Sequence, residues 1–261
     1  MIFETHAHYD DKAFEEDREQ LLNGLQEQGI STVVNIGASL ASSRASLALA
    51  EQYPFVYAAV GVHPDETKEL TEENFGELVS MIAHEKTVAV GEIGLDYYWD
   101  STPREVQKYW FEKQLDLALQ HNLPVVIHSR EAAADTLATM KEFYEKSNGT
   151  LTGIIHCFSY GPELAEEYVK MGFYLGVGGV VTFKNGKKLK EVVQAVPLEL
   201  LVLETDCPYL APEPNRGKRN DSGNLRYVAE GIAALKGISV EEVIRVTEEN
   251  AKKLYRIKNS I

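Results

Sequence analysis

The sequence is short of basic residues, of cysteine and of long apolar runs, and each shortage excludes a class of protein. Lysine and arginine total 26 against 40 acidic residues, and the resulting formal charge of −14 repels a phosphate backbone over most of the surface. No apolar stretch approaches the ~20 residues of a membrane helix, so we expect no membrane partner. Only two cysteines occur, which is typical of a reduced, cytoplasmic protein and not of a disulfide scaffold.

Some familiar motifs are also missing. Neither a Gly-rich dinucleotide fingerprint nor a phosphate-loop motif is present, which removes the usual reasons to expect an open nucleotide-binding sheet. The first residues, MIFETHAHYDD, carry histidines and acids where a signal peptide carries basic residues and then an apolar core, which again predicts a cytoplasmic protein. Cys157 and Cys207 directly follow His156 and Asp206, and alternation along a strand predicts packed, non-catalytic thiols that point away from those residues.

What the sequence does contain is a regular alternation of strand-like and helix-like segments. Amphipathic stretches of helical period, such as residues 103–121, separate the apolar runs. Eight units in 261 residues, without a compositional break, predict parallel strands in a single domain, 1–261, and favour a TIM (β/α)8 barrel over an open sheet. The eight β-rich runs are residues 2–5, 32–36, 56–60, 88–90, 125–127, 153–155, 173–177 and 200–203.

Potential metal ligands lie on these runs or directly after them. Because the active site of a barrel is built from the strand ends that feed the following helices, we expect these scattered residues to meet there. Imidazole nitrogens and carboxylate oxygens together suit zinc, manganese, iron or magnesium. The predicted ligands are His6, His8, Glu92, His128, His156 and Asp206.

Each ligand has a predicted role. His6 and His8 alternate on the first strand, so both imidazoles face one side, and Asp206 at the end of the neighbouring last strand is expected to touch the same ion and to accept a proton from the attacking water. Glu204, two residues earlier, either orients a ligand or caps the barrel interior.

The remaining ligands predict a second ion. A lone histidine is more often a core residue, but His128 and His156 end neighbouring apolar runs, and this repetition favours a second metal position. Glu92 follows an apolar run between two glycines. Its alternative is a structural ion pair, although a bridging ligand is preferred because a metal relieves the cost of a buried carboxylate.

Four further residues are predicted to contact substrate. His63 reaches the same rim, and Arg130 either holds an anionic group or forms a salt bridge. Arg216 and Arg219 lie in a long loop, residues 208–223, where an anionic substrate would dock. A second basic cluster, of Lys184, Lys187, Lys188 and Lys190, reads more simply as a solvated helix face.

Six motifs together resemble a known family. THAHYDD, GVHPD, GEIGLDYY, PVVIHSR, IIHCFS and ETDCPYL are similar, in order and spacing, to the TatD-type deoxyribonucleases of the amidohydrolase superfamily. The resemblance implies a TIM barrel with DNase activity and two divalent ions, one on His6, His8 and Asp206, the other on His128 and His156, with Glu92 shared or nearby. Two positions depart from the family pattern: Glu4 stands where Asp is more common, and Asp221-Ser222 follows the RGKRN block.

Three functions follow as hypotheses. The first is phosphodiester hydrolysis, 3′-5′ exonuclease-like on single-stranded DNA, using two divalent ions, Mg²⁺ or Mn²⁺, at a site that Zn²⁺ or Ni²⁺ would also fit, with Arg216 or Arg219 neutralising charge. The second is ester or amide hydrolysis, such as aminoacyl-tRNA deacylation, which the charge of −14 and a sparse aromatic rim favour mildly. The third, a non-catalytic barrel, is expected to have lost a ligand, and none is missing. We expect no stable protein partner.

Overall fold

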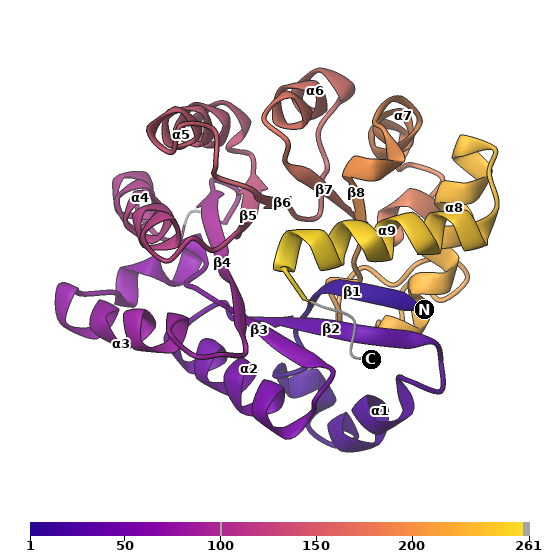
Figure 1. Ribbon diagram of the computed structural model, residues 1–261, viewed down its shortest axis with the longest axis horizontal. Helices are drawn as coiled ribbons and strands as arrows, with labels where there is room; N and C mark the ends of the chain where they lie inside the picture. Colours follow the sequence, from indigo (N-terminus) through magenta and orange to yellow (C-terminus); the bar gives the residue numbers. More distant parts are fainter. Residues whose placement is uncertain (100, 258–261) are drawn as a thin grey trace. The chain divides into compact units, whose positions relative to one another are not determined.

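The structure is a computed structural model that describes residues 1–99 and 101–257 (Figure 1). Strands alternate with helices along the chain, and the contacts divide it into two compact units, one of Met1–Asn35 with the chain from His156 onward, the other of Ile36–Ile155. Within the described residues, no helix combines the length and the apolar character needed to cross a membrane.

The first unit contains four strands that form parallel pairs. β1 pairs with β2 and β7 with β8, and a bridge between Ala7 and Cys207 joins the end of β1 to the segment after β8. Its elements are β1 (Ile2–Ala7), η1 (Lys12–Phe14), α1 (Arg18–Gly24), β2 (Ile30–Ile36), α6 (Pro162–Lys170), β7 (Tyr174–Val177), η3 (Gly179–Thr182), α7 (Lys187–Ala195), η4 (Leu198–Leu200), β8 (Leu201–Leu203), η5 (Ser222–Asn224), α8 (Leu225–Lys236) and α9 (Val240–Tyr255).

The second unit is a continuous run of four strands in chain order, β3-β4-β5-β6, all parallel. Helices connect these strands, as parallel pairing requires. Its elements are α2 (Leu40–Gln52), β3 (Val56–Val60), η2 (Pro64–Glu69), α3 (Glu72–Ile82), β4 (Thr87–Asp96), α4 (Arg104–Gln120), β5 (Val125–Arg130), α5 (Ala133–Lys146) and β6 (Gly153–Ile155).

Helix α9 closes the first unit over β1 and β8 (Figure 1). Ser239 caps its first turn by accepting a hydrogen bond from the backbone of Glu242, and its apolar face is buried. The amide of Asn250 donates to the carbonyls of Leu198 and Leu201, and the hydroxyl of Tyr255 donates to the carbonyl of Thr5. These bonds fix the two strands whose ends carry predicted ligands.

Gly94 determines how closely β4 and β5 approach each other. Its φ is 148°, in the region that favours glycine, and a Cβ added there would lie 1.9 Å from the carbonyl oxygen of His128. No other residue fits without moving β5. The glycine therefore holds the backbone of β5 against β4 at His128.

The predicted strands are confirmed in position. Four of them are longer than predicted, β1 and β2 by two residues each and β4 and β5 by more. β4 was expected to end at Val90 but continues to Asp96, so Glu92 lies within the strand and not after it. β5 was expected to end at Ile127 and continues to Arg130. The sequence underestimates both because glycines and polar residues, which usually end strands, here occupy the part of each strand where polar side chains are needed.

Candidate metal centre

In the first unit, the end of β1 and the segment after β8 bring predicted ligands together. The backbone amide of Asp206 donates to the carbonyl of His6, and that of His8 donates to the carbonyl of Cys207, both at 2.9 Å. In consequence Asp206 Oδ1 lies 3.6 Å from His6 Nε2 and 3.4 Å from His8 Nε2. The two imidazoles approach each other to 3.1 Å between their Nε2 atoms, as predicted for histidines that face one side of a strand.

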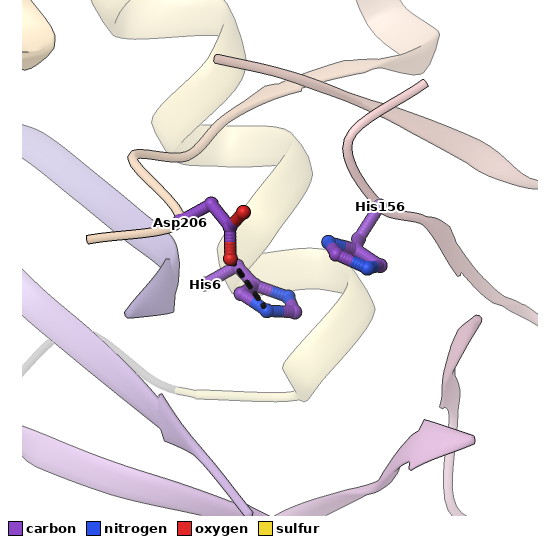
Figure 2. Close-up of side chains that lie close together, drawn as sticks. All are labelled: His6, His156 and Asp206. Carbon is purple, nitrogen blue, oxygen red and sulfur yellow. Dashed lines mark ion pairs between the residues drawn. The ribbon is translucent and has the colours of Figure 1, made fainter. Parts of the chain in front are cut away.

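His156, directly after β6, belongs to the same group. Figure 2 shows its ring face to face with that of His6, with the ring centroids 4.0 Å apart and the planes at 10°. One ligand atom from each of His6, His156 and Asp206 lies within 4.8 Å of the others. The structure thus places His156 beside His6 and Asp206, whereas the sequence assigned it with His128 to a second ion.

Asp206 is held in an ionised state. Burial raises the pKa of its carboxyl, but the hydrogen bond from His8 and the charges of His6 and His156 outweigh burial, and the pKa lies below the ordinary value. Its backbone φ of 55° is left-handed, a conformation that aspartate tolerates better than most residues. An ionised carboxylate with two imidazoles beside it is suited to bind a cation.

Two buried glutamates, Glu4 and Glu204, bond to the backbone of this group. Glu4 on β1 accepts hydrogen bonds from the backbone amides of His6 and Thr205, at 3.1 and 3.0 Å, and from the Thr205 hydroxyl at 2.7 Å. It thereby connects the residue that precedes Asp206 to His6. Burial raises the pKa of Glu4 to about 7, and burial together with the neighbouring carboxylates raises that of Glu204 to about 8.

Glu204 orients the backbone next to a ligand, one of the two roles predicted for it. Its carboxylate accepts a hydrogen bond from the amide of Cys157, the residue after His156. The space around it is closed on the other side, because a Cβ on Gly176 would lie 2.1 Å from its Oε2. Glu204 therefore fixes the segment that carries His156.

In the second unit, β4 and β5 place Glu92 and His128 in contact. The Nδ1 of His128 lies 2.9 Å from Oε1 of Glu92, whose side chain is only 5% exposed. His63, which follows β3, brings its Nε2 to 3.7 Å from the same oxygen and its ring to 4.3 Å from that of His128. These three residues form a second group of closely spaced ligand atoms, in which His63 was predicted only as a substrate contact.

Asp96, at the end of β4, is a site residue that the sequence analysis missed. Its Oδ2 lies 2.9 Å from Nε2 of His128, so the imidazole is held between two carboxylates. Burial lowers the pKa of His128, but the hydrogen bonds and charges of Asp96 and Glu92 outweigh burial and raise it to about 9. A place that stabilises a protonated imidazole between two carboxylates also favours a divalent cation.

The predicted substrate contacts lie in different surroundings. The guanidinium of Arg130, at the exposed end of β5, stacks on the rings of Tyr98 and Trp99, at 3.9 and 5.3 Å from their centroids. Both rings are more than half exposed, so the prediction of a sparse aromatic rim is wrong at this turn. Glu92, Asp96 and Arg130 form one polar series along the paired ends of β4 and β5.

The two arginines of the loop after β8 have acidic partners. Arg219 forms two hydrogen bonds to Asp17, at 2.7 and 2.5 Å, and stacks on Phe14. Arg216 is 47% exposed and lies 3.9 Å from Glu213. Contact with substrate stays a prediction for both, and for Arg219 it would require exchange of the Asp17 carboxylate for a phosphate.

The basic cluster at the start of α7 and just before it is largely solvated, as predicted. Lys184, Lys187 and Lys188 are exposed, whereas Lys190 donates to the carbonyl of Phe183.

The cysteines differ from each other more than predicted. Cys207 is fully buried. Cys157 is only partly buried and lines a cavity of about 30 Å³ with Glu204 and Asp206. The expectation of a packed Cys157 is wrong because the chain leaves strand geometry at this residue, with φ 44°, so strand alternation does not apply to it.

The donor sets of both units fit divalent metal ions. Each combines imidazole nitrogens with carboxylate oxygens at spacings that one ion can span, and this mixture suits Zn²⁺, Mn²⁺ or Fe²⁺, with Mg²⁺ favoured where oxygens dominate. His128 also has an arrangement usual for a metal-binding histidine, because one ring nitrogen contacts the carboxylate of Asp96 while the other, Nδ1, lies beside Glu92 and would hold an ion.

Comparison with known proteins defines the class. The crystal structure of YJJV, a TatD homologue from Escherichia coli K12, superposes with a TM-score of 0.91 at 29% identity, covering 98% of each chain. The fold is therefore the TIM barrel, as predicted. A metal-dependent hydrolase of Bacillus subtilis strain 168, named YabD and described as uncharacterized, is 44% identical over 257 residues, which are 98% of this chain and 100% of the relative.

The family follows from the same comparisons. The family model for TatD related DNase matches residues 3–256, and the chain belongs to this family of metal-dependent hydrolases. A relative from Pantoea vagans strain C9-1, 31% identical over 98% of this chain and 100% of its own length, carries the name 3′-5′ ssDNA/RNA exonuclease TatD.

Proposed function

We propose that this hydrolase cleaves phosphodiester bonds of single-stranded DNA, as a 3′-5′ exonuclease, with two divalent metal ions. The observation that carries the proposal is the pair of donor groups: His6, His8, His156 and Asp206 in the first unit, and Glu92 and His128, with His63 beside them, in the second. The name of the Pantoea relative supports the substrate class. We propose Mg²⁺ or Mn²⁺ as the working ions and the cytoplasm as the location.

The ions would supply positive charge at the two donor groups. When bound, divalent ions lower the pKa of water and neutralise the charge that develops on a phosphate during cleavage. Asp206 is proposed as the proton acceptor because its carboxylate is ionised, and because the oxygen that does not face His6 points away from that ring in Figure 2. Glu4 and Glu204 keep His6, Asp206 and the His156 segment in position.

His63 is proposed to orient the scissile phosphate. Its Nδ1 accepts a hydrogen bond from the backbone amide of Asp65, so in the neutral ring the proton lies on Nε2. We therefore propose Nε2, which lies 3.7 Å from Oε1 of Glu92, as the donor to a phosphate oxygen. Arg130 is proposed as a second contact to the anionic strand.

Hydrolysis of end-labelled single-stranded DNA tests the function. Metal-stripped protein should be inactive, Mg²⁺ or Mn²⁺ should restore cleavage, and a 5′-labelled strand should shorten in single-nucleotide steps from its 3′ end. Asp206→Asn should reduce kcat by at least about 100-fold, the usual contribution of a positioned general base. Asp116→Asn, which alters an exposed carboxylate paired with Lys146, serves as the matched control and should keep full activity. Absence of cleavage by folded, metal-loaded protein would overturn the proposal.

Ester or amide hydrolysis by the same residues is the second candidate. The formal charge of −14 favours small esters or amides as its substrates, because most of the surface repels a polyanion. Aminoacyl-tRNA deacylation is the same chemistry on a polyanionic substrate, which the surface charge does not favour. Release of the amino acid from charged tRNA by the preparation used above, with DNA intact, would establish this candidate in place of the nuclease.

A further inference from the structure

The turn after β4 presents two aromatic rings to solvent. Tyr98 is 54% exposed and Trp99 is 60% exposed, and their rings meet edge to face with centroids 4.9 Å apart. Tyr97, the preceding residue, is tied to the protein instead, because its hydroxyl donates to Asp135 and Arg104 stacks on its ring. Contact between large aromatic rings and water is unfavourable, and a ligand that covers the rings removes that contact. This pair is therefore a candidate binding surface.

Arg130 adds a cation to the same surface. Its guanidinium lies over both rings, closest to Tyr98, at the exposed end of β5. Aromatic side chains next to arginine are the arrangement that binds single-stranded nucleic acids, in which bases stack on the rings and the cation attracts the backbone. In a chain with a formal charge of −14, a local cation on a stacking surface favours a ligand that is both aromatic and anionic.

Asp96 fixes this surface beside the second donor group. Its Oδ1 accepts hydrogen bonds from the backbone amides of Tyr98 and Trp99, at 2.9 and 3.2 Å. Its other oxygen, Oδ2, contacts His128 at 2.9 Å, and the residue is 1% exposed. A single buried carboxylate thus holds both the aromatic turn and a predicted metal ligand.

We propose that Tyr98, Trp99 and Arg130 form a nucleobase-stacking platform, which holds a base of the single-stranded substrate next to the phosphate to be cleaved. Tyr98 and Trp99 provide the stacking faces, and Arg130 aligns them and attracts the strand. The inference rests on the proposed nuclease function and specifies how it selects unpaired strands, since a base inside a duplex offers no free face to a ring.

Tryptophan fluorescence tests the platform directly. The chain has two tryptophans, and Trp110 is only 5% exposed, so quenching by a stacked base reports on Trp99. We would titrate metal-loaded protein with an oligothymidylate that has phosphorothioate linkages, which resist hydrolysis, and with an abasic strand of the same length and linkage. Quenching is expected with the first strand only. Trp99→Phe should lose the signal and retain most of the affinity.

Alanine variants then measure the contribution to binding by competition against a labelled strand. Tyr98→Ala and Trp99→Ala should each weaken binding of the base-bearing strand by about 5-fold to 100-fold, the range known for base stacking on aromatic side chains, and leave the abasic strand unchanged. Tyr109→Ala is the matched control, because Tyr109 is an exposed tyrosine of the same unit that bonds to Glu72 on α3. Equal effects on both strands, or equal effects of Tyr98→Ala and Tyr109→Ala, would overturn the platform.

The failure of the platform and that of the nuclease proposal are separable. Cleavage of unmodified oligothymidylate with unselective binding would reject the platform and keep the nuclease. Base-dependent binding without cleavage of DNA would keep the platform and reject the nuclease. An oligouridylate and an oligodeoxyuridylate included in the competition differ only in the 2′-hydroxyl, and so distinguish the ribose from the deoxyribose form of the same ligand.

Discussion

At the scale of single residues, the candidate site consists of imidazoles and carboxylates on strands or directly after them. Polar side chains that end apolar runs, such as His128, His156 and Asp206, were found because nothing else in a buried strand explains them. Asp96 was missed because β4 was predicted to end at Val90, which placed Asp96 in a loop. The spacing of Glu92, Gly94 and Asp96 at alternate positions was the signal that strand period continued.

Asp96→Asn tests the residue that the sequence missed. The amide keeps the shape of the side chain but removes the negative charge that holds His128, so we expect affinity for Mn²⁺ to fall about 10-fold to 100-fold, as is usual for carboxylates that orient a ligating histidine. Titration calorimetry of the metal-stripped protein measures this. Asp135→Asn, which removes only the exposed partner of Tyr97, should bind metal normally, and equal losses in both variants would contradict the assignment.

At the scale of elements, prediction succeeded where local and tertiary preferences agree. The helix predicted for residues 103–121 is observed as α4, with Pro103 and His121 as its caps, because its apolar period and its proline both mark the same boundaries. The full lengths of β4 and β5 could not be predicted. Many of their final residues are polar or glycine. Their extended conformation is explained by the pairing of β4 with β5 and by the contacts among the predicted metal-ligating side chains.

Gly94→Ala tests the close approach of β4 and β5. A Cβ at this position would collide with the carbonyl of His128, and the left-handed φ adds strain, so we expect the free energy of unfolding to fall by at least about 2 kcal/mol. Gly76→Ala in α3 is the control, because nothing lies within 4 Å of the added carbon, and we expect it to stabilise the protein by about 0.5 to 1 kcal/mol. Urea unfolding measures the free energy of unfolding of both variants. An unchanged value for Gly94→Ala would show that β5 moves to accommodate the added carbon.

Glu248→Gln tests how α9 is attached near the amino-terminal strand. Burial raises the pKa of Glu248, but its bonds with Lys252 and the terminal ammonium outweigh burial and lower the pKa. The ionised form therefore stabilises the fold above the ordinary pKa, and this contribution is lost as the pH falls through the lowered value. We expect the variant to be about 0.5 to 1 kcal/mol less stable near neutral pH, with a difference that shrinks as the pH falls through the lowered pKa of Glu248.

The check on that prediction is a neighbouring glutamate. Glu249 pairs with Arg245 on the same helix and is 63% exposed, so Glu249→Gln should change stability little at any pH. Denaturant curves at several pH values compare the two variants. A constant difference between Glu248→Gln and the parent protein would show that its carboxylate charge contributes nothing.

At the scale of the whole molecule, the eight-unit alternation was enough to predict the TIM barrel, since few folds accommodate eight parallel strands with short crossovers. The grouping of ligands was harder. His156 lies closer in the sequence to His128 than to Asp206, and only the structure shows its ring against that of His6. Sequence periodicity fixes which face a residue lies on but does not fix which neighbour it meets.

Metal binding should stabilise the folded chain as a whole. The two groups concentrate carboxylates in largely buried positions, and an ion that binds only the folded state adds about 2.7 kcal/mol at a concentration 100 times its Kd. For a chain of this size we expect Tm to rise by roughly 5 to 10 °C when Mn²⁺ is added to metal-stripped protein. Differential scanning calorimetry measures this, with NaCl at the same ionic strength as the control. Equal shifts from both salts would indicate screening and not site binding.

The carboxylate of Asp96 has a consequence for how ion and strand assist each other. One of its oxygens bonds to the aromatic turn and the other contacts His128. Because the Asp96 side chain is almost fully buried, a ligand that fixes the turn would also fix His128, and an ion that fixes His128 would also fix the turn. Binding free energies coupled in this way are reciprocal, and whatever factor an ion adds to the affinity for a base, the base adds to the affinity for the ion. An enzyme engaged on a strand would then bind its metal more tightly than an idle one, and would stay active at metal concentrations too low to load the free protein.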